Sequence, residues 1–458
     1  MKTNLLIFVI ISFVPIIFCA SGGVRAAINE TMITSLLNTF KYKINSEMKN
    51  IDLGSFKIWF NIHGVNVWLH FPENFLSYFD IKLINGGLNI KTTKPMSASA
   101  TGKVRFKFVL FSIDKKLTVR VNNFRMDANI AIKSERLKDG GYRPKVEFMS
   151  SPDVNADIRV ESGGISGMIL SALANLLISI FKKKIINLGV NEGESQLMKI
   201  VNKFETEVPI NKDLVLDYSL IDPIKVYNKF IELNAYGVLY NKNKENTKKN
   251  KNGMTFTQLP SISKLEKQFQ LYVSEYTLNS ALYTYLETYY KPINFKVSSN
   301  IAELVFPEFK SLFNDKEATF NLRYRKLPKL QVTENGIFVK SDSLFNVTVP
   351  SRLKPIFYSE VELTLGVYLN VNYGPSVTIN IKDLSAKLGT TYIKDVCQNK
   401  IPNIEVGFKA IENTIILLIN ALAKNMVYDF KPIMGIKFTD IKLENKNGYL
   451  VIYYNVSK

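Results

Sequence analysis

The chain has 458 residues, of which 46% are hydrophobic, and only two cysteines. This length and composition are sufficient for two domains with sizeable cores, and the two cysteines exclude a fold that depends on a framework of disulfides. The net charge of +19 is spread over both halves and favours acidic partners such as anionic lipid headgroups, acidic glycans or nucleic acid, although a Lys- and Asn-rich composition explains it without any partner.

The N-terminus has the pattern of a secretory signal. Lys2 precedes an uncharged, mostly apolar run over residues 5–18, and small residues follow. This order predicts a signal peptide over residues 1–21 and hence a secreted, extracellular protein. An uncleaved anchor is the alternative, but the run is short for a membrane span and contains Pro15. Secretion makes nucleic acid the least fitting of the acidic partners, so none is expected.

The same pattern of a helix N-terminus occurs twice in the sequence. Residues 28–37 align with residues 273–282 without a gap, and each stretch has a capping-type residue, a glutamate and then apolar residues at helical spacing. Chance is an alternative for one such match, because amphipathic helix starts are common. A second recurrence elsewhere in the same order would indicate an internal repeat.

Long strands supply that second recurrence. Residues 361–373 alternate strictly between apolar and polar, which predicts one long strand with one buried face. Apolar residues occupy odd positions over 117–121 and even positions over 124–132, and the same change separates 377–381 from 384–388. Side chains along a strand alternate with a period of two, so the apolar positions can change from odd to even only where an extra residue is inserted. Both halves are therefore predicted to contain a β-bulge at this point. We therefore interpret the chain as two diverged copies of one unit.

Each unit also contains a second helix that is apolar around most of its circumference. These helices are predicted at residues 165–181 and 408–426, and each must be buried on several sides. A transmembrane helix is the alternative for the first, although its polar residues form a stripe. Between the units, residues 241–252 are rich in Lys and Asn and are predicted to be a solvated loop, with a basic recognition tract as the alternative.

Catalytic motifs are nearly absent. The sequence lacks a nucleophile elbow, a phosphate-binding loop, a dinucleotide fingerprint and a zinc-protease motif. His63 and His70 would lie on opposite faces of a regular strand and could not share a metal ion. Carboxylates are plentiful, but nothing singles out an acid pair. We therefore predict that the protein is not an enzyme and uses no cofactor, metal or catalytic residue.

The two helices of each unit carry more apolar surface than one sheet face requires, so each unit is expected to enclose an apolar pocket. A filled core is the alternative. An acyl chain of about sixteen carbons would gain on the order of 12 kcal/mol from burial before costs. The predicted lining is Met32, Ile33, Leu36, Leu173 and Leu177 in the first unit, and Leu278, Leu282, Leu418 and Leu422 in the second.

A row of basic residues is predicted at one end of the first unit. Lys103, Arg105 and Lys107 have the same parity and therefore share a strand face, and two further lysines are expected at the turn that follows. This row is either a solvated strand face or a docking site for phosphate-bearing surfaces. We call the following set the basic tip: Lys103, Arg105, Lys107, Lys115 and Lys116.

Several segments together carry a family resemblance. In chain order they are Gly22–Asn29, Gly102–Lys107, Asp217–Pro223, Ile231–Tyr240, Gln268–Tyr276, Gly435–Glu444 and Gly448–Tyr454. In this order they resemble the family of bactericidal/permeability-increasing protein, lipopolysaccharide-binding protein and the plasma lipid transfer proteins. Each motif is loose by itself, and the specificity comes from the order and the repeat.

The resemblance implies an α+β fold in the shape of a two-barrel boomerang. Each barrel is a long curved antiparallel sheet wrapped on amphipathic helices, and a central sheet joins the two. The implied divisions are a lipid-binding barrel over 22–220, the central passage with its Lys/Asn-rich loop over 221–272, and a second lipid-binding barrel with the closing strands over 273–458. A phospholipid pocket is implied in each barrel.

Two functions follow from the resemblance. The first is a lipid carrier that holds phospholipid or another acyl lipid and transfers it. The alternative is innate-immune, antibacterial binding of lipopolysaccharide or anionic membranes through the basic tip. The chain departs from the family at a common disulfide, whose positions correspond to Phe148 and Met198, and in spreading its charge over both halves. Candidate glycosylation sites, which suit a secreted glycoprotein, are Asn29, Asn346 and Asn455.

Overall fold

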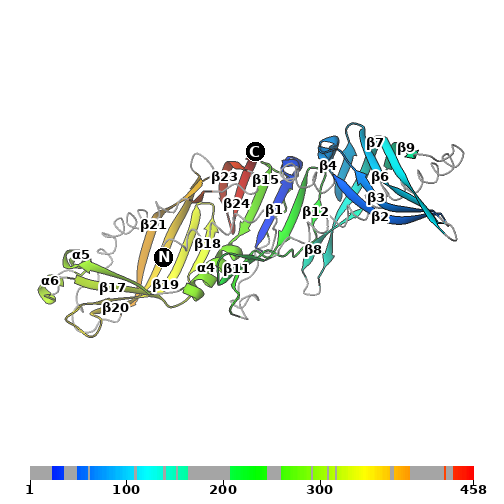
Figure 1. Cartoon of the computed structure of the whole chain (residues 1–458). Coiled ribbons are helices and arrows are strands. Elements are labelled where there is room, and N and C mark those ends of the chain that lie inside the picture. The colour runs from blue at the N-terminus through cyan, green and yellow to red at the C-terminus, as the bar shows by residue number, and fades with distance from the viewer. Residues whose placement is uncertain are drawn as a thin grey trace.

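The protein is elongated, with one curved sheet at each end and a smaller sheet between them (Figure 1). The structure is a computed structural model. It describes residues 23–35, 49–59, 62–107, 111–137, 141–150, 153–162, 207–244, 259–289, 292–306, 309–314, 317–371, 376–391, 428–429 and 437–457. The predicted α+β class, with two curved antiparallel sheets joined by a central one, is confirmed.

The central sheet joins strands from distant parts of the sequence. Strand β1, at the start of the first unit, pairs antiparallel with β15, at the start of the second, with Val24 opposite Val273 and Ile28 opposite Phe269. The two repeated helix starts therefore leave this sheet at opposite ends. The strand order is β12 (Lys225–Val226), β13 (Phe230–Ala235), β1 (Val24–Asn29), β15 (Phe269–Ser274), β24 (Tyr449–Ser457) and β23 (Lys437–Lys446).

The first barrel is a sheet whose longest strand, β7, pairs with four neighbours. Its order is β2 (Asn50–Trp59), β3 (Ile62–His70), β6 (Met96–Lys107), β7 (Ser112–Arg136), β5 (Gly87–Thr92) and β4 (Phe79–Ile84), with β8 (Tyr142–Phe148) and β9 (Asp153–Ser162) also on β7 and a short 3-10 helix at Phe75–Tyr78. The predicted parity change is confirmed, because Val121 and Phe124 are both buried. Asn123, with φ of 52°, and a register shift beside it form the bulge.

The second barrel repeats this plan. Its order is β16 (Ile293–Ser298), β17 (Glu317–Tyr324), β19 (Gly336–Thr348), β20 (Phe357–Val371), β21 (Ser376–Thr391) and β22 (Tyr428–Asp429), with β18 (Lys329–Thr333) on β19. The predicted long strand corresponds to β20. The second parity change is confirmed as well, since the pairing of β20 with β21 shifts between Gly366 opposite Asp383 and Val367 opposite Ile381.

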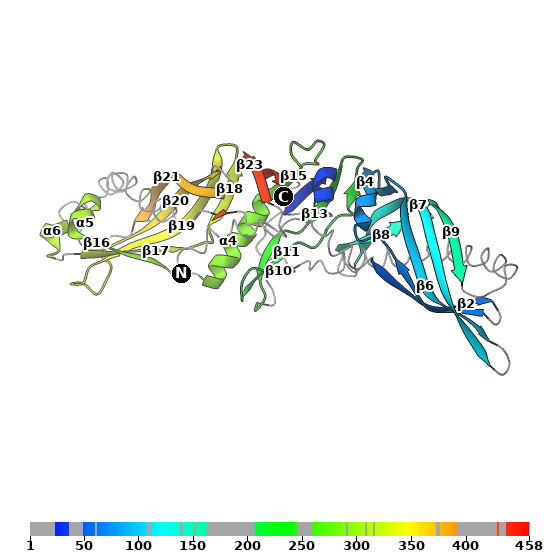
Figure 2. The same cartoon turned by 45° about the horizontal axis from the view of Figure 1, so that its top comes forward.

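Three described helices belong to the second half of the chain. Helix α4 (Glu275–Tyr289) follows β15 directly, as the repeated helix start predicts. It packs against β18 and against a small sheet of β10 (Glu207–Pro209), β11 (Leu214–Asp217) and β14 (Val238–Asn241). Helices α5 (Ser299–Val305) and α6 (Phe309–Leu312) cap the far end of the second barrel, away from the central sheet (Figure 2).

Candidate lipid-binding site and basic tip

The two helix starts are held by equivalent contacts. Asn29 Oδ1 accepts a hydrogen bond from the Met32 backbone N–H at 2.9 Å, and Ser274 Oγ accepts one from Thr277 N–H at 3.3 Å. Both are N-caps of the same spacing, which satisfy a backbone donor that a helix start leaves free. Residues 30–35 are helical, as α4 is. The aligned residues thus perform the same task in both units.

The aligned glutamates also act alike. Glu30 Oε2 accepts a hydrogen bond from the backbone N–H of Leu83 in β4 at 2.9 Å. Glu275 Oε2 accepts one from Val332 in β18 at 3.0 Å. Each donor strand lies at the edge of its barrel, where its N–H would otherwise lack a partner. Both helices are therefore fastened to the barrel that they enter.

Polar side chains on α4 bind strand edges on two sides. Asn279 donates to the Leu330 carbonyl at 2.8 Å and accepts from the Leu330 N–H at 2.7 Å. Thr284 Oγ1 donates to the Leu239 carbonyl at 2.8 Å, so the helix joins β18 to β14. Because these groups are satisfied, the first turns of α4 are buried around nearly their whole circumference. Burial also raises the pKa of Tyr276 to about 12.

The predicted pocket residues that the structure describes lie in one apolar cluster. Met32, Leu278 and Leu282 are buried in it, and Ile33 packs against it. The cluster runs along the central sheet and includes residues from both halves of the chain. The remaining predicted pocket residues lie outside the described residues, so the two-pocket assignment stays a prediction: Leu36, Leu173, Leu177, Leu418 and Leu422.

The inner face of the second barrel changes along its length. On β20, Phe357 and Val361 are buried at the outer end. Leu363, Leu365 and Leu369 have the same parity but are only partly buried. Side chains of one parity share a face, so the inner face is apolar throughout. Toward the central sheet Val367 is buried, but its neighbours on this face are incompletely covered. Such a surface has the character of a site for an apolar ligand.

An aromatic plug fills the outer end of this barrel. Its rings pack edge to face or tilted, with centroids separated by 5.1 Å between Phe306 and Phe357 and by 5.3 Å between Phe320 and Phe345. A filled core, the alternative to a pocket, is therefore present at this end. We call these six residues the aromatic plug: Phe306, Phe309, Phe313, Phe320, Phe345 and Phe357.

A groove of about 590 Å³ lies where the first barrel meets the central passage. Ile132 and Phe148 line one side and Pro223 and Ile224 the other, and the ion pair between Lys133 and Glu147 lies in its wall. Of the predicted pocket residues, those that the structure describes do not line it. Phe148 contributes apolar surface to this groove.

The basic tip lies on the hairpin of β6 and β7. Strand pairing sets Lys103 opposite Lys116 and Arg105 opposite Asp114, all on the outer face with Lys107. The expectation for the two further lysines was wrong. Lys115 and Lys116 lie within β7 instead of the turn, and Lys115 is opposite buried Val104, on the inner face. Lys107 and Lys116 are exposed, and Arg105 is partly so.

Charges at the basic tip are partly compensated. Arg105 donates two hydrogen bonds to the Asp114 carboxylate, at 2.7 and 2.9 Å. This contact lowers the pKa of Asp114 below its ordinary value and raises the pKa of Arg105. Lys103 and Lys116, by contrast, face each other as like charges, an arrangement that is unfavourable without an anion nearby.

Two apolar residues at this tip were not predicted as site residues. Phe111 and Ile113, which follow the hairpin turn, are 59% and 40% exposed. The sequence signal was present, because residues 108–111 are an uncharged apolar run flanked by the predicted cations. The tip therefore presents both cations and apolar side chains.

The histidines lie on one face, which corrects the sequence expectation. A bulge at Asn66, with φ of 51°, shifts the register of β3 against β6. His63 is consequently opposite Arg105 and His70 opposite Ser99, two residues of equal parity. Six residues of strand separate the pairs by about 20 Å, so distance now prevents a shared metal ion. His70 bonds Asn50 and Thr101 instead.

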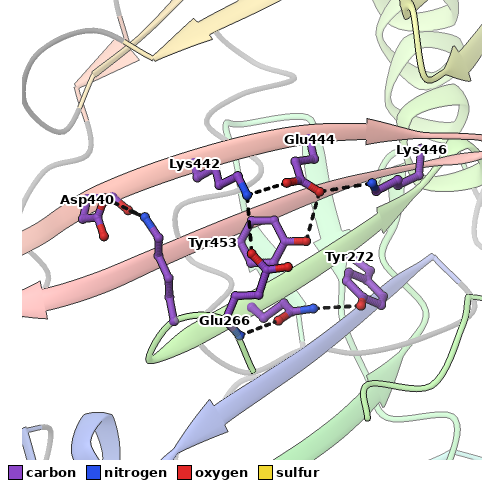
Figure 3. Close-up of polar contacts among 9 residues, drawn as sticks. Glu266, Tyr272, Asp440, Lys442, Glu444, Lys446 and Tyr453 are labelled. Atoms are coloured by element: carbon purple, nitrogen blue, oxygen red, sulfur yellow. Dashed lines mark hydrogen bonds and ion pairs between the residues drawn. The ribbon is translucent and has the colours of Figure 1, made fainter. Parts of the chain in front are cut away.

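A dense carboxylate cluster on the central sheet is fully paired with lysines (Figure 3). Lys442 Nζ lies 2.6 Å from Glu444 and 3.4 Å from Glu266, and Lys267 lies 2.7 Å from Asp440. The hydrogen bond from Lys442 lowers the pKa of Glu444, the opposite of what a general acid requires. This cluster fastens β23 and β24 to the segment before β15.

Two other kinds of site are absent from the described residues. No group of three or more His, Cys, Asp or Glu side chains in these residues is arranged to hold a metal ion. Among the described helices, none has the length and apolar character needed to cross a membrane. Cys397, residues 165–181 and residues 408–426 lie outside the described part of the chain.

The three candidate glycosylation sites lie in strands. Asn29 ends β1 and caps a helix. Asn346 is in β19, and Asn455 in β24 accepts a hydrogen bond from Gln268 N–H and donates one to Asp440, both at 3.1 Å. Glycosylation at these residues stays a prediction.

Comparisons with known proteins found one family model and several solved structures that match this chain. The family model described as "LBP / BPI / CETP family, C-terminal domain" matches residues 209–456. The crystal structure of lipopolysaccharide binding protein is similar over 96% of this chain and 99% of that one, with 15% identity and a TM-score of 0.48.

Two further solved structures are similar. P47 from Clostridium botulinum A2 is similar over 95% of this chain and 97% of its own, with 12% identity and a TM-score of 0.32. Takeout 1 from Epiphyas postvittana covers 39% of this chain and 93% of its own, with 12% identity and a TM-score of 0.27. No sequence among the curated proteins matches significantly.

Proposed function

The chain belongs to the LBP / BPI / CETP family, and on that premise we propose that it is a secreted lipid-binding protein. It holds phospholipid or another acyl lipid in apolar pockets, one in each barrel, and transfers it. The barrels are those proposed from the sequence, over residues 22–220 and 273–458. Binding and transfer of this kind need no catalytic residue, cofactor or metal.

One observation carries this proposal. The inner face of the second barrel is apolar, yet between the aromatic plug and the central sheet it is only partly covered, at Val339, Leu365 and Leu369. Val339 is directly opposite Leu365 in the strand pairing, so these side chains form one surface. A lipid chain gains roughly 0.8 kcal/mol for each CH₂ that it buries there.

The test is lipid extraction and native mass spectrometry on gently purified, secreted protein. We expect phospholipid or fatty acyl chains to accompany the chain. Replacing Leu365 by Trp would fill the second pocket and lower the lipid content by one molecule per chain. The matched control is Thr364→Trp, next along β20 and of the opposite parity, which should leave the lipid content unchanged. Lipid-free parent protein would contradict the proposal.

A second candidate function is supported by the basic tip. Cations on the outer face of β6 and β7 and the exposed Phe111 and Ile113 lie at the same end of the first barrel, with Ile113, opposite Phe106, on the inner face. Cations and apolar side chains at one end of a barrel suit lipopolysaccharide or an anionic membrane. Each basic residue near such a surface is worth about 1 kcal/mol. Reversing Lys103, Arg105 and Lys107 to Glu should weaken binding to anionic vesicles, and the loss should shrink as salt rises. Unchanged binding at low salt would remove this candidate.

A further inference from the structure

Exposed apolar side chains gather at the outer end of the second barrel. Nine large hydrophobic side chains are exposed in the described part of the chain, and four of them lie here, on α5, on α6 and in the loop between β19 and β20. Leu304 is 57% exposed and Leu353 is fully exposed. We call the following four residues the apolar end: Ile301, Leu304, Leu312 and Leu353.

Helix α5 has apolar residues on both of its faces. Ala302 and Val305 are buried over the aromatic plug, as expected for the inner stripe of a surface helix. Ile301 and Leu304 have the same spacing of three but point outward. A surface helix ordinarily has a polar outer face, and apolar side chains that cluster on a surface mark an interaction site.

The loop carrying Leu353 is held beside α6. The guanidinium of Arg352 lies 5.8 Å from the centre of the Phe313 ring, just after α6, and Lys310 on α6 pairs with Glu303 on α5 at 2.8 Å. Pro350 and Pro355 flank the loop, and their fixed φ angles restrict it. The loop and the two helices therefore lie together at the outer end of the barrel, where Figure 2 shows α5 and α6.

The charges around this surface define its partner. Leu353 stands between Arg352 and Lys354, and neither cation forms an ion pair with a described carboxylate. Leu353 projects completely from the surface, so a rigid protein partner would need a matching pocket. A lipid interface adapts to a projecting leucine and supplies phosphates for the cations beside it.

We infer that the apolar end is a docking surface for anionic phospholipid membranes, separate from the basic tip. Leu304 and Leu353 enter the boundary between headgroups and acyl chains, while Arg352 and Lys354 contact lipid phosphates. This docking does not depend on lipid held inside the barrels.

The test is co-sedimentation of the full chain with vesicles of phosphatidylcholine and phosphatidylserine. Binding is measured in a background in which Lys103, Arg105 and Lys107 are reversed to Glu, so that the basic tip does not contribute. We expect residual binding in this background. Replacing both Leu304 and Leu353 by Gln should reduce it by about tenfold or more, because burying a leucine contributes at least a factor of about ten.

A matched pair of double charge reversals separates the effect of this surface on vesicle binding from the effect of net charge. Arg352→Glu with Lys354→Glu should weaken binding on anionic vesicles, by about fivefold for each cation removed. The control is Lys329→Glu with Lys340→Glu, an exposed cross-strand pair in the same barrel, which should change binding much less. Equal losses in both double variants would overturn the inference.

Two more results would overturn it. The first is parent-like vesicle binding by the Leu304→Gln, Leu353→Gln variant. The second is a shift of that variant from oligomer to monomer in light scattering without a change in vesicle binding, which would assign the surface to a protein partner. The docking surface and the pockets proposed above can fail separately. If the parent protein carries no extractable lipid but the variant loses vesicle binding, the docking surface is supported and the pockets are contradicted.

Insertion can be observed directly with Leu353→Trp. Both native tryptophans, Trp59 and Trp68, belong to the first barrel. Brominated phospholipids should quench the added fluorescence at position 353. Absence of quenching, with the vesicles bound, would overturn the docking of this loop.

Discussion

The outer ends of the two barrels differ, although both barrels are curved antiparallel sheets on either side of the same central sheet. The first barrel ends in the β6–β7 hairpin, where Lys103 and Lys116 face each other and Phe111 is exposed near the turn. The second ends in two short helices over the aromatic plug, with leucines exposed outside and Arg352 and Lys354 in the adjoining loop. Near the central sheet, by contrast, both units use the same cap and the same glutamate contact.

The difference shows which part of the repeat carries the shared structure. Contacts at the helix starts satisfy backbone groups of barrel edges and must be made in each unit. The outer ends have no such requirement, so one became polar and hairpin-shaped and the other apolar and helical. Functional differences between the barrels are therefore expected at the ends.

The largest contrast is expected in stability. Replacing Phe320 of the aromatic plug by Ala should lower the free energy of unfolding by about 3–5 kcal/mol, because it leaves a cavity among packed rings. Phe106→Ala at the other end removes a ring that is only partly buried and should cost less. Urea unfolding measures both, and equal losses would show that the first barrel is filled in the same way.

The equivalence of the helix starts can be tested by removing both caps. Asn29→Ala and Ser274→Ala should each cost about 1 kcal/mol of unfolding free energy, since each leaves one backbone donor without its partner. Thr31→Ala is the control for the first, because it removes the glycosylation pattern but keeps the cap. A loss of unfolding free energy at only one of the two sites would show that the two helix starts are not equivalent.

The compensating carboxylate of the basic tip gives a binding prediction. Asp114→Asn should strengthen binding to anionic vesicles about fivefold at neutral pH, since one negative charge leaves the tip. The control is Asp127→Asn. Asp127 is also on β7 but far from the tip, and its replacement breaks a similar ion pair with Lys91. Equal effects of both variants would indicate that only net charge matters.

The pKa of Asp114 sets the pH dependence of this effect. Arg105 depresses the folded pKa, so the ion pair is present at neutral pH and is lost as the pH falls through that lowered value. Vesicle binding by the parent should therefore rise toward that of Asp114→Asn only at acid pH, below the ordinary range of aspartate. A rise near neutral pH would point to another group.

The smallest expected effect is that of a reducing agent. Cys19 lies in the predicted signal peptide, so the proposed secreted chain would keep Cys397 as its only cysteine and would have no internal disulfide to break. The melting temperature of the monomer should stay unchanged. A fall of several degrees would reveal a bond between two chains.

The sequence by itself determined the period of the strands and the two helix starts. Alternation of apolar residues defined the long strands, and the parity changes at Asn123 and Asp383 located both bulges, because an inserted residue is visible in the pattern. The capping residue and the glutamate identified both helix starts. These features are local, so the linear order of residues is enough to find them.

Only the tertiary structure decided the features that depend on which segments meet. The bulge at Asn66 placed His63 and His70 on one face of the sheet, although regular alternation along β3 predicted that they lie on opposite faces. Cross-strand register moved Lys115 to the inner face and joined Arg105 to Asp114. The exposure of Leu304 depends on which face of α5 the aromatic plug covers, and residues far apart in the sequence build that plug.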